Sequence, residues 1–576
     1  MSILSENAKL IASKRYYRNK NEGWDGLSVR CGSEASRAES TNQSKWSDKF
    51  SEVICNLEFM PGGRILRNLG RLRGSLFNCY VIPINDSIEE IGQFLKEALI
   101  IWSEGGGIGT NISSLRPTGT PIKGKGGESS GPISFLKAAD AAAATIQSGG
   151  QRRAAGMCLE HVRHPGIMEF IDSKSVDEIL SYFNISVAVD EEFINAVEKK
   201  EKWDLKFNQK IYNTVEASDV WDRIMHNMIN YAEPGLLNWN NIRSNNSFYF
   251  APIIGTNPCG EAALEEYGIC DLGSIVLTKF ISKVNTNWKR MEEVLRVAVR
   301  FLDNIIDINK YILQEFALSA TNGRRVGVGV MGLAEYLFAK KIRYGSQKSI
   351  YEIEKLFKFI RDVTYDESIK LAVEKGAFPK FDPIEYGKAH FIRSLPASTR
   401  MDIKKHGIRN VTLTAIAPTG TISMIPEVSS GIEPLPAKAY KRSDRISERY
   451  YIHPQFKQFV EDGIDHEEMP EWFVDSFDLD PKNHLDVQVA VQKYVDGAVS
   501  KTINMPKGTK TEDLSDLLLE YIHDVKGVTV YVDGSRENQP INKIDVEEAV
   551  KSILNGDYNT DIDKEANACP KGNCEI

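Results

Sequence analysis

The sequence lacks any apolar stretch close to the roughly 20 residues that a helix needs to cross a membrane. It also lacks a secretory signal, because residues 1–7 begin polar and lead into the basic segment 14–18. It carries no excess of positive charge: the net charge is −8, whereas a nucleic-acid-binding protein usually shows a basic face. We therefore expect a cytoplasmic protein with neither a membrane nor a nucleic acid as partner, although small phosphorylated ligands stay compatible.

Tandem repeats with a period of about 20–50 residues are absent as well. The composition, with 42% hydrophobic and 26% charged residues, is that of an ordinary globular protein. The length of 576 residues is compatible with three or four domains or with one large α/β barrel.

Periodic patterns predict strands that alternate with long helices. Buried strands are expected at residues 326–333, 411–417 and 527–532, and helices at residues 133–147 and 288–317. This alternation favours an α/β fold. Residues 1–58 have the pattern of a polar helical region, and we expect residues 546–576 to form a flexible tail, because they are polar and acidic with little to bury.

Cysteine is not abundant, with eight residues in the whole chain. In a reducing cytosol structural disulfides are not expected, which favours catalytic or redox roles. Cys31, Cys55 and Cys158 have no suggestive context, and we interpret them as packing residues. The remaining cysteines, Cys79, Cys259, Cys270, Cys569 and Cys574, have neighbours that suggest chemistry.

Near the C-terminus, Cys569 and Cys574 are five positions apart around Pro570 and Gly572. A turn there brings two sulfurs within disulfide reach, which needs Cα atoms about 4.4–6.8 Å apart. The alternatives are half of a zinc site and an accidental pair; zinc needs four ligands and the last histidine is His523, so we predict no metal. A dithiol on a mobile tether could carry reducing equivalents between a buried site and an external reductant.

A thiol lies between an amide and a carboxylate in the segment Asn257, Cys259 and Glu261. If the backbone is extended, the three side chains project to one side, where the amide and the carboxylate could hold two ribose hydroxyls beside the sulfur. A nucleophilic cysteine usually needs a histidine base; this segment has none, although a distant one stays open. Cys270 follows Cys259 after 11 residues, and strand pairing with Cys79 would create a second dithiol.

The order of these motifs resembles the catalytic subunit of ribonucleotide reductases. The matching segments are residues 77–79, 104–109, 257–261, 327–333 and 417–423 and the tail cysteines, and the resemblance runs from residue 4 to residue 574. It implies a ten-stranded α/β barrel over residues 59–545, with a central finger loop that carries the radical cysteine. The helical region 1–58 and the redox tail 546–576 would flank this catalytic barrel.

The resemblance also implies a role for each residue of the site. Cys259 would be the thiyl radical that abstracts the ribose 3′-hydrogen, Glu261 the general base on the 3′-hydroxyl, and Asn257 a hydrogen-bonding partner of the ribose. Cys79 and Cys270 would assist loss of the 2′-hydroxyl and reduce C2′, ending as a disulfide. The tail cysteines would reduce that disulfide, and thioredoxin or glutaredoxin would reduce the tail.

Two further sets of residues follow from the resemblance. The substrate, a ribonucleoside di- or triphosphate, would contact Asn78, Gly106, Gly107, Pro418, Thr419, Gly420, Thr421, Ile422 and Ser423. Read without the family, residues 418–421 are simply a turn. A dNTP or ATP effector would contact Asp86, Ser87, Arg116, Ile122, Gln151 and Arg152, which are otherwise solvated loop residues. An effector site of this kind suggests a homodimer.

The radical source divides this family into groups. One group relays a radical from a separate metal-bearing subunit through two adjacent tyrosines, but here Tyr531 is followed by Val532, and the pair Tyr450–Tyr451 stands in a different context. Residues 500–506 and 533–536 resemble the adenosylcobalamin-dependent group, as does the spacing from Cys259 to Cys270. We therefore predict an adenosylcobalamin-dependent ribonucleotide reductase. The alternatives are a catalytic subunit that receives its radical from a metal-bearing partner, and a non-enzymatic nucleotide-binding redox sensor.

Overall fold

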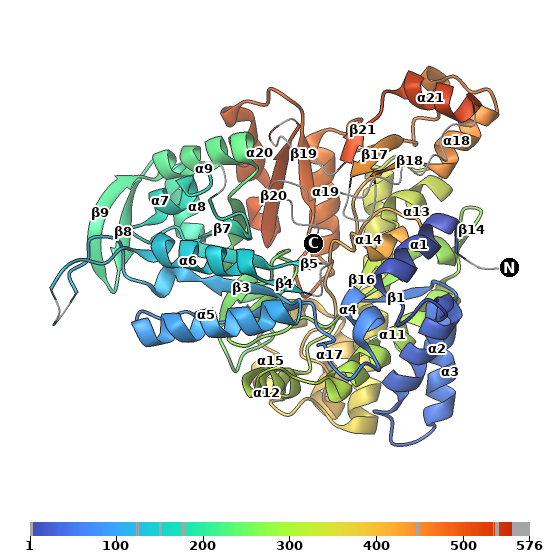
Figure 1. The fold of residues 1–576 in the computed structure, drawn as a ribbon, viewed down its shortest axis with the longest axis horizontal. Helices are drawn as coiled ribbons and strands as arrows, with labels where there is room; N and C mark the ends of the chain where they lie inside the picture. The colour runs from blue at the N-terminus through green and yellow to red at the C-terminus, as the bar shows by residue number, and fades with distance from the viewer. Residues whose placement is uncertain are drawn as a thin grey trace.

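The structure is a computed structural model, and it describes residues 4–122, 124, 126–148, 152–175, 179–443, 448–533, 535 and 541–555. Helices and strands alternate along most of the chain (Figure 1), which confirms the predicted mixed α/β fold. Within the described residues, no helix is both long and apolar enough to serve as a membrane span.

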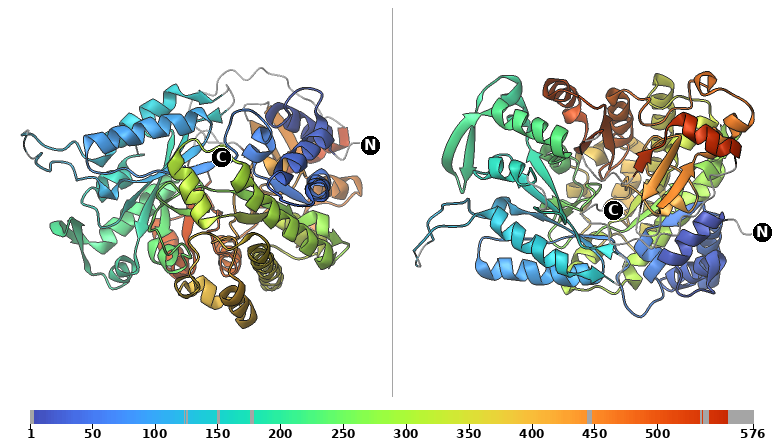
Figure 2. Two further views of the ribbon diagram at one scale, coloured as in Figure 1. Left: turned by 90° about the horizontal axis from the view of Figure 1, so that it is seen from below. Right: turned by 45° about the horizontal axis from the view of Figure 1, so that its top comes forward.

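The N-terminal region consists of three helices, α1 (Glu6–Arg15), α2 (Gly23–Ser36) and α3 (Gln43–Cys55). They lie at one end of the molecule, and the hairpin of β8 (Lys202–Phe207) and β9 (Lys210–Glu216) lies at the other end, as both views of Figure 2 show. Phe50 of α3 packs edge-on against Phe301 of α11 (Trp288–Ile308), with ring centroids 5.3 Å apart. Buried Arg300 of α11 pairs with Glu39 at 3.0 Å, so apolar and ionic contacts both fix these helices to the rest of the fold.

The largest sheet has seven strands and combines two sets that run in opposite directions. In spatial order the strands are β19 (Thr502–Met505), β20 (Gly527–Val532), β10 (Gly235–Asn238), β7 (Phe183–Val189), β6 (Ala155–His161), β3 (Gly107–Asn111) and β2 (Cys79–Val81). Neighbours are parallel except for β10 and β20, which are antiparallel. Helices α5 (Ile88–Ser103) and α6 (Pro132–Thr145) run beside the β2–β3 edge (Figure 1).

A second sheet contains β1 (Phe59–Pro61), β13 (Leu272–Val276) and β16 (Gly327–Met331). All residues of β13 and β16 are buried, which confirms the predicted strand at 326–333. A Cβ atom at Gly329 would lie 2.6 Å from the carbonyl oxygen of Ala415, so glycine lets the two backbones approach closely. Within the described residues, the predicted strand at 411–417 pairs with its neighbours through single parallel bridges, Val328 with Thr414 and Ile416 with Val499.

The regular strands of the described residues form separate sheets rather than one closed sheet. The helix predicted at 133–147 corresponds to α6, which ends at Thr145. The helix predicted at 288–317 is wrong beyond Ile308, where α11 ends; a separate helix, α12 (Gln314–Gly323), follows.

The prediction of a flexible tail from residue 546 is wrong for its first ten residues, which form α21 (Val546–Asn555). Ala549 and Ile553 of this helix are buried in a small apolar cluster that also contains Phe456 and Phe459. Val546, Ala549 and Ile553 recur at helical spacing, which is the signal that the acidic composition concealed.

Candidate functional site

The residues at 257–261 lie in the turn of an antiparallel hairpin made by β11 (Ile253–Thr256) and β12 (Ala263–Glu265). The Ala262 N–H donates to Asn257 Oδ1 at 2.9 Å, and the Gly260 N–H donates to the Asn257 carbonyl at 3.0 Å. Gly260 has φ +78°, a conformation that side chains disfavour. The extended backbone considered for this segment is therefore wrong. The turn instead buries Asn257 and Glu261 and leaves Cys259 half-buried.

The hairpin lies between the two sets of strands. On one side it touches β3, where Asn111 Nδ2 donates to the Ile254 carbonyl at 3.0 Å and a Cβ atom at Gly109 would overlap the carbonyl of Thr256. On the other side the Ala498 N–H donates to the Glu261 carbonyl at 2.8 Å. The turn that carries Cys259 is thus anchored from both directions.

Gly106 and Gly107, which sequence reasoning assigned to the substrate, lie next to this turn and have packing reasons of their own. A Cβ atom at Gly107 would lie 2.9 Å from Cγ of Pro258, the residue before Cys259. At Gly106 it would lie 2.7 Å from the ring of Tyr80. The Gly107 N–H also donates to the Asn78 carbonyl at 2.8 Å, so Asn78 belongs to the same neighbourhood.

The structure brings Cys79 and Cys270 together. Tyr80 and Ile269 form an antiparallel bridge, and the Cys270 N–H donates to the Cys79 carbonyl at 3.1 Å. Both residues are buried in a small apolar cluster that includes Ala262 of the hairpin. Burial raises the pKa of the Cys270 thiol well above its usual range, and nearby Cys79 and Glu261 add to this effect. At neutral pH Cys270 is therefore a thiol, the form that carries a hydrogen.

Glu261 is 2% exposed, and burial raises the pKa of its carboxyl to about 7, although the amide of Asn257 favours the charged form. The Asn257 amide lies close enough to the Glu261 carboxyl to act on it, but among the described residues no hydrogen bond of ordinary geometry reaches Glu261 Oε2 or Asn257 Nδ2, and both atoms are buried. Buried polar atoms nearly always have partners, so this acceptor and this donor indicate a ligand or ordered water that bonds to both.

The loop 418–423 follows the buried segment 411–417, whose Ala417 packs against the cluster that holds the two thiols. Thr419 has φ 55°, and its hydroxyl accepts from the Gly431 N–H at 2.8 Å. The Ser423 N–H donates to the Thr419 carbonyl at 2.9 Å, at the start of a short 3₁₀ turn, η3 (Ile422–Met424). Pro418, Gly420 and Thr421 are half-buried.

The N–H groups of Gly420 and Thr421 are not used by any hydrogen bond in the part of the chain that the structure describes. Neighbouring backbone donors on a turn form a cradle for an oxyanion. The loop therefore has the donors that phosphate binding requires, beside the thiol cluster.

Two of the predicted effector residues are in contact: Arg116 Nε lies 2.9 Å from Asp86 Oδ2, and the Arg116 N–H donates to Asp86 Oδ1 at 3.2 Å. Ser87 caps α5, because its hydroxyl accepts from the Glu90 N–H. Ile122 is 36% exposed on a separate loop. The structure places the backbone of Arg152 in the short strand β5 (Arg152–Arg153), whereas Gln151, Cys569 and Cys574 lie outside the described residues.

The tyrosines considered for radical transfer lie in different sheets. Tyr531 is on β20 and is followed by buried Val532. Tyr451 is on β18 (Glu448–Ile452) and stacks on Tyr440 of β17 (Ala439–Ser443), with ring centroids 5.1 Å apart. The pair 450–451 thus belongs to a separate three-stranded sheet.

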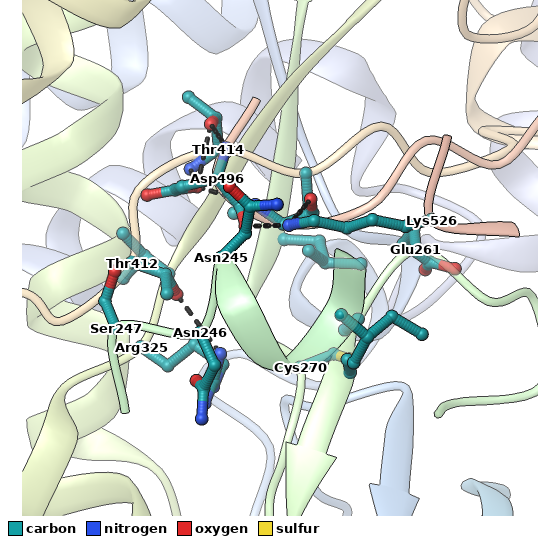
Figure 3. A pocket seen from close by; sticks show the side chains of 18 of the residues that line it. Asn245, Asn246, Ser247, Glu261, Cys270, Arg325, Thr412, Thr414, Asp496 and Lys526 are labelled. Atoms are coloured by element: carbon teal, nitrogen blue, oxygen red, sulfur yellow. Dashed lines mark hydrogen bonds between the residues drawn. The ribbon is translucent and has the colours of Figure 1, made fainter. Parts of the chain in front are cut away.

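Sequence reasoning missed a pocket behind the hairpin that is lined by both polar and apolar residues and whose wall includes Glu261 and Cys270 (Figure 3). Other lining residues are Asp271, Arg325 and Lys526, which come from distant parts of the chain. The one available signal was Asp271, a carboxylate directly after a candidate catalytic cysteine.

Comparison with known proteins agrees with this geometry. Residues 77–531 match the family described as "Ribonucleotide reductase, barrel domain". A curated relative, "Vitamin B12-dependent ribonucleoside-diphosphate reductase" from Mycobacterium tuberculosis (strain CDC 1551 / Oshkosh), is 36% identical over 542 residues, which cover 89% of this chain and 76% of the relative.

Two further relatives match most of this chain at different levels of sequence identity. A protein of the same name from Thermoplasma acidophilum is 35% identical over 574 residues, covering 93% of this chain and 72% of the relative. "Ribonucleoside-diphosphate reductase subunit alpha" from Chlamydia pneumoniae is 25% identical over 572 residues, covering 83% of this chain and 54% of the relative.

Proposed function

The chain belongs to the ribonucleotide reductase family, and we propose that it reduces ribonucleotides to 2′-deoxyribonucleotides by a thiyl-radical mechanism that depends on adenosylcobalamin. One observation carries this proposal. The turn with Cys259 holds a buried amide and a buried carboxyl beside two adjacent buried thiols, and one polar atom of each group makes no hydrogen bond of ordinary geometry within the described residues. A ribose offers two neighbouring hydroxyls that would satisfy both atoms.

In this mechanism the Cys259 thiyl takes the 3′-hydrogen of the ribose and becomes a thiol. Glu261 accepts the proton of the 3′-hydroxyl, and a pKa of about 7 suits a base that works near neutral pH. Asn257 Nδ2 donates to a ribose hydroxyl and fixes the sugar. Removing the 3′-hydroxyl proton pushes electron density toward C2′, which weakens the bond to the 2′-hydroxyl.

Cys79 and Cys270 then supply two hydrogens. One leaves with the 2′-hydroxyl as water, and the other reduces C2′, so the two sulfurs end as a disulfide. Glu261 returns its proton to the 3′-oxygen, and Cys259 returns its hydrogen to C3′ and is a thiyl again. The sum is one ribonucleotide and one dithiol converted to one deoxyribonucleotide, one water and one disulfide. Burial keeps water and stray reductants away from the open-shell sugar.

The loop 418–423 would hold the substrate phosphate through the N–H groups of Gly420 and Thr421 and through short hydroxyls. Its position beside the thiol cluster would orient the ribose toward Cys259. Asn78, Gly106 and Gly107 border the same space. The relatives above are named diphosphate reductases, which favours a diphosphate substrate here.

The surroundings of Cys259 fit adenosylcobalamin. Cys259 is half-buried, and a Cβ atom built on neighbouring Gly260 meets no described atom within 4 Å, so the turn is open on the side that Gly260 faces. The bound cofactor supplies an unpaired electron by homolysis of its cobalt–carbon bond. Residues 500–506, which resemble the cobalamin-dependent group, would border it. A metal-bearing partner subunit is the second candidate source, but the vitamin B12-dependent relatives are 35–36% identical and the subunit alpha relative is 25% identical.

The fold that we infer for residues 59–545 is a ten-stranded α/β barrel with the 253–265 hairpin as its central finger. Single bridges that link the two sheets support it: Tyr80 with Ile269, Val328 with Thr414, and Ile416 with Val499. The hairpin's contacts with β3 on one side and with Ala498 on the other fit a position between two barrel halves.

The proposal also includes an effector site that regulates the enzyme and a pair of tail cysteines that reduces the active-site disulfide. The Asp86–Arg116 pair would border a site for a dNTP or ATP effector in a homodimer. Cys569 and Cys574 would reduce the Cys79–Cys270 disulfide, and thioredoxin or glutaredoxin would reduce the tail.

One assay separates the candidate functions. The pure chain is incubated with a ribonucleotide and a small dithiol, with or without adenosylcobalamin. Formation of deoxyribonucleotide only with the cofactor supports the proposal. Turnover that requires an added metal-bearing subunit supports the second radical source. Nucleotide binding without turnover in either case contradicts both and leaves a redox sensor.

A further inference from the structure

The pocket behind the hairpin has a cavity volume of about 30 Å³, room for about two water molecules, and it is partly open to solvent. It is polar on several sides: Ser247, Asp271, Arg325, Thr412 and Lys526 line it. Figure 3 shows Glu261, Cys270 and Lys526 around this space, and Arg325 bonded to Thr412. The pocket therefore reaches two groups that carry the proposed chemistry.

The position of the pocket is opposite to the phosphate loop. Asp271 precedes β13, Val326 precedes β16 and Lys526 precedes β20, so the lining residues gather where strands begin. Parallel bridges join β13, β16 and Thr414, which places these beginnings at one edge. The loop 418–423 instead follows the end of the segment 411–417. The Glu261–Cys270 region is thus bordered by the phosphate loop at one end and by the pocket at the other.

Several polar atoms on the pocket's lining residues have no partner in the described part of the chain. They are Asp271 Oδ1 and Oδ2, Ser247 Oγ and Arg325 Nε, all buried. Asp271 and Ser247 are each 1% exposed. These unpaired acceptors, hydroxyl and donor belong to residues that line one space, which indicates ordered water there. A buried water molecule typically makes about three hydrogen bonds to such groups.

The charged groups around the pocket are held by the protein itself. Lys526 Nζ donates to the carbonyls of Asp496 and Gly497 at 2.7 and 2.8 Å. Arg325 Nη2 donates to Glu265 at 2.9 Å. The carboxylate of Asp496 accepts backbone N–H groups of the 411–417 segment. Lys526, Asp496 and Nη2 of Arg325 are therefore already engaged. Burial, and then the charge of Asp303, raise the pKa of the Asp271 carboxyl well above its usual range, so this group is neutral at neutral pH. Both facts favour water over a charged ligand as the occupant.

We propose that this pocket is a water-filled passage through which Glu261 exchanges protons with solvent while a nucleotide covers the opposite end of the site. A proton released by the Glu261 carboxyl passes to a water molecule, the last water of the passage releases one to bulk solvent, and the reverse path returns it, so nothing is oxidised or reduced. The carboxyl of Asp271 holds the waters in place, and Ser247 borders them. The role of Glu261 as base rests on the proposed function.

A crystal structure at high resolution tests the occupant directly. We expect ordered waters bonded to Asp271 and Ser247, in a chain that leads toward Glu261. A closed space, or a space filled by side chains, overturns the proposal.

Proton exchange is measured on matched variants that leave the catalytic groups intact. Ser247→Leu fills part of the passage, and Ser247→Ala keeps it open. Each variant, with ribonucleotide bound and no cofactor present, is mixed into D₂O at pH 5.5, where the Glu261 carboxyl is protonated. The infrared band of that carboxyl, identified by its loss in Glu261→Gln, reports deuteration. Ser247→Ala should exchange as fast as the parent, and Ser247→Leu should lose the fast phase.

Equal exchange in the two variants overturns the passage. Since no turnover is required, a protein that binds nucleotide but fails to reduce it contradicts the proposed function without affecting this comparison. If no nucleotide binds, or if Ser247→Leu does not fold, the crystal structure alone decides.

Discussion

The carboxyl of Glu261 gives the site a pH dependence that can be worked out in advance. Burial raises its pKa to about 7 from an ordinary value of 4.5. Because a general base acts in its ionised form, kcat/KM should rise with pH through about 7. About a tenth of the carboxyl is ionised at pH 6 and about nine-tenths at pH 8, so kcat/KM should rise about tenfold between them.

The raised pKa of Glu261 also affects folding stability, which should fall with rising pH whereas kcat/KM should rise. The folded state holds the proton up to about pH 7 and the unfolded state only up to about pH 4.5, so the unfolded state binds fewer protons between these values. Folding stability therefore falls as pH rises through this window. A pKa shift of about 2.5 units corresponds to about 3 kcal/mol of folding stability lost across this window. Because glutamine does not ionise, Glu261→Gln removes this pH-dependent loss.

The assay combines kcat/KM from pH 5.5 to 8.5 with denaturant unfolding at pH 5 and pH 8. Glu261→Gln should be inactive, and it should gain stability over the parent at pH 8 far more than at pH 5. Glu266→Gln, an exposed neighbour, serves as the control and should change neither quantity. A kcat/KM profile that is flat above pH 5.5, together with equal effects of Glu261→Gln at both pH values, would refute the reasoning.

Three further predictions concern other parts of the chain. Gly107→Ala places a Cβ atom 2.9 Å from Pro258 and should lower kcat by shifting Cys259, whereas Gly92→Ala, which meets no described atom within 4 Å, should not; steady-state kinetics with a thermal melt decide. Asp303→Ala leaves buried Arg324 without its 2.8 Å partner and should cost about 3–5 kcal/mol of unfolding free energy, more than Asp307→Ala at the same arginine. Cys569→Ser should lose thioredoxin-driven turnover but keep turnover with a small dithiol, and equal loss with both reductants would remove the shuttle role.

Local sequence patterns were sufficient to predict strands and helices whose buried residues recur at regular spacing. The glycine and β-branched alternation of β16 marked a buried strand, because that pattern requires close backbone approach. The proximity of Cys79 and Cys270 followed from the family resemblance, since their pairing joins segments about 190 residues apart that no local pattern connects.

Other features depend on tertiary contacts and were missed or wrong. The turn at 257–261 is set by hydrogen bonds between Asn257 and Ala262 and by contacts on both sides, so the segment alone could not exclude an extended backbone. The pocket at Asp271 forms only where the beginnings of distant strands meet. Helix α21 was concealed because acidic residues alternate with its apolar face.

The sulfur of Cys259 carries the account, and one paired measurement tests it most directly. Deoxyribonucleotide formation and ribonucleotide affinity are measured side by side for the parent protein and for Cys259→Ser, in the presence of adenosylcobalamin and a small dithiol. The account predicts that the variant binds the ribonucleotide with unchanged affinity and forms no product. Product formation by the variant at a rate comparable to that of the parent would contradict it.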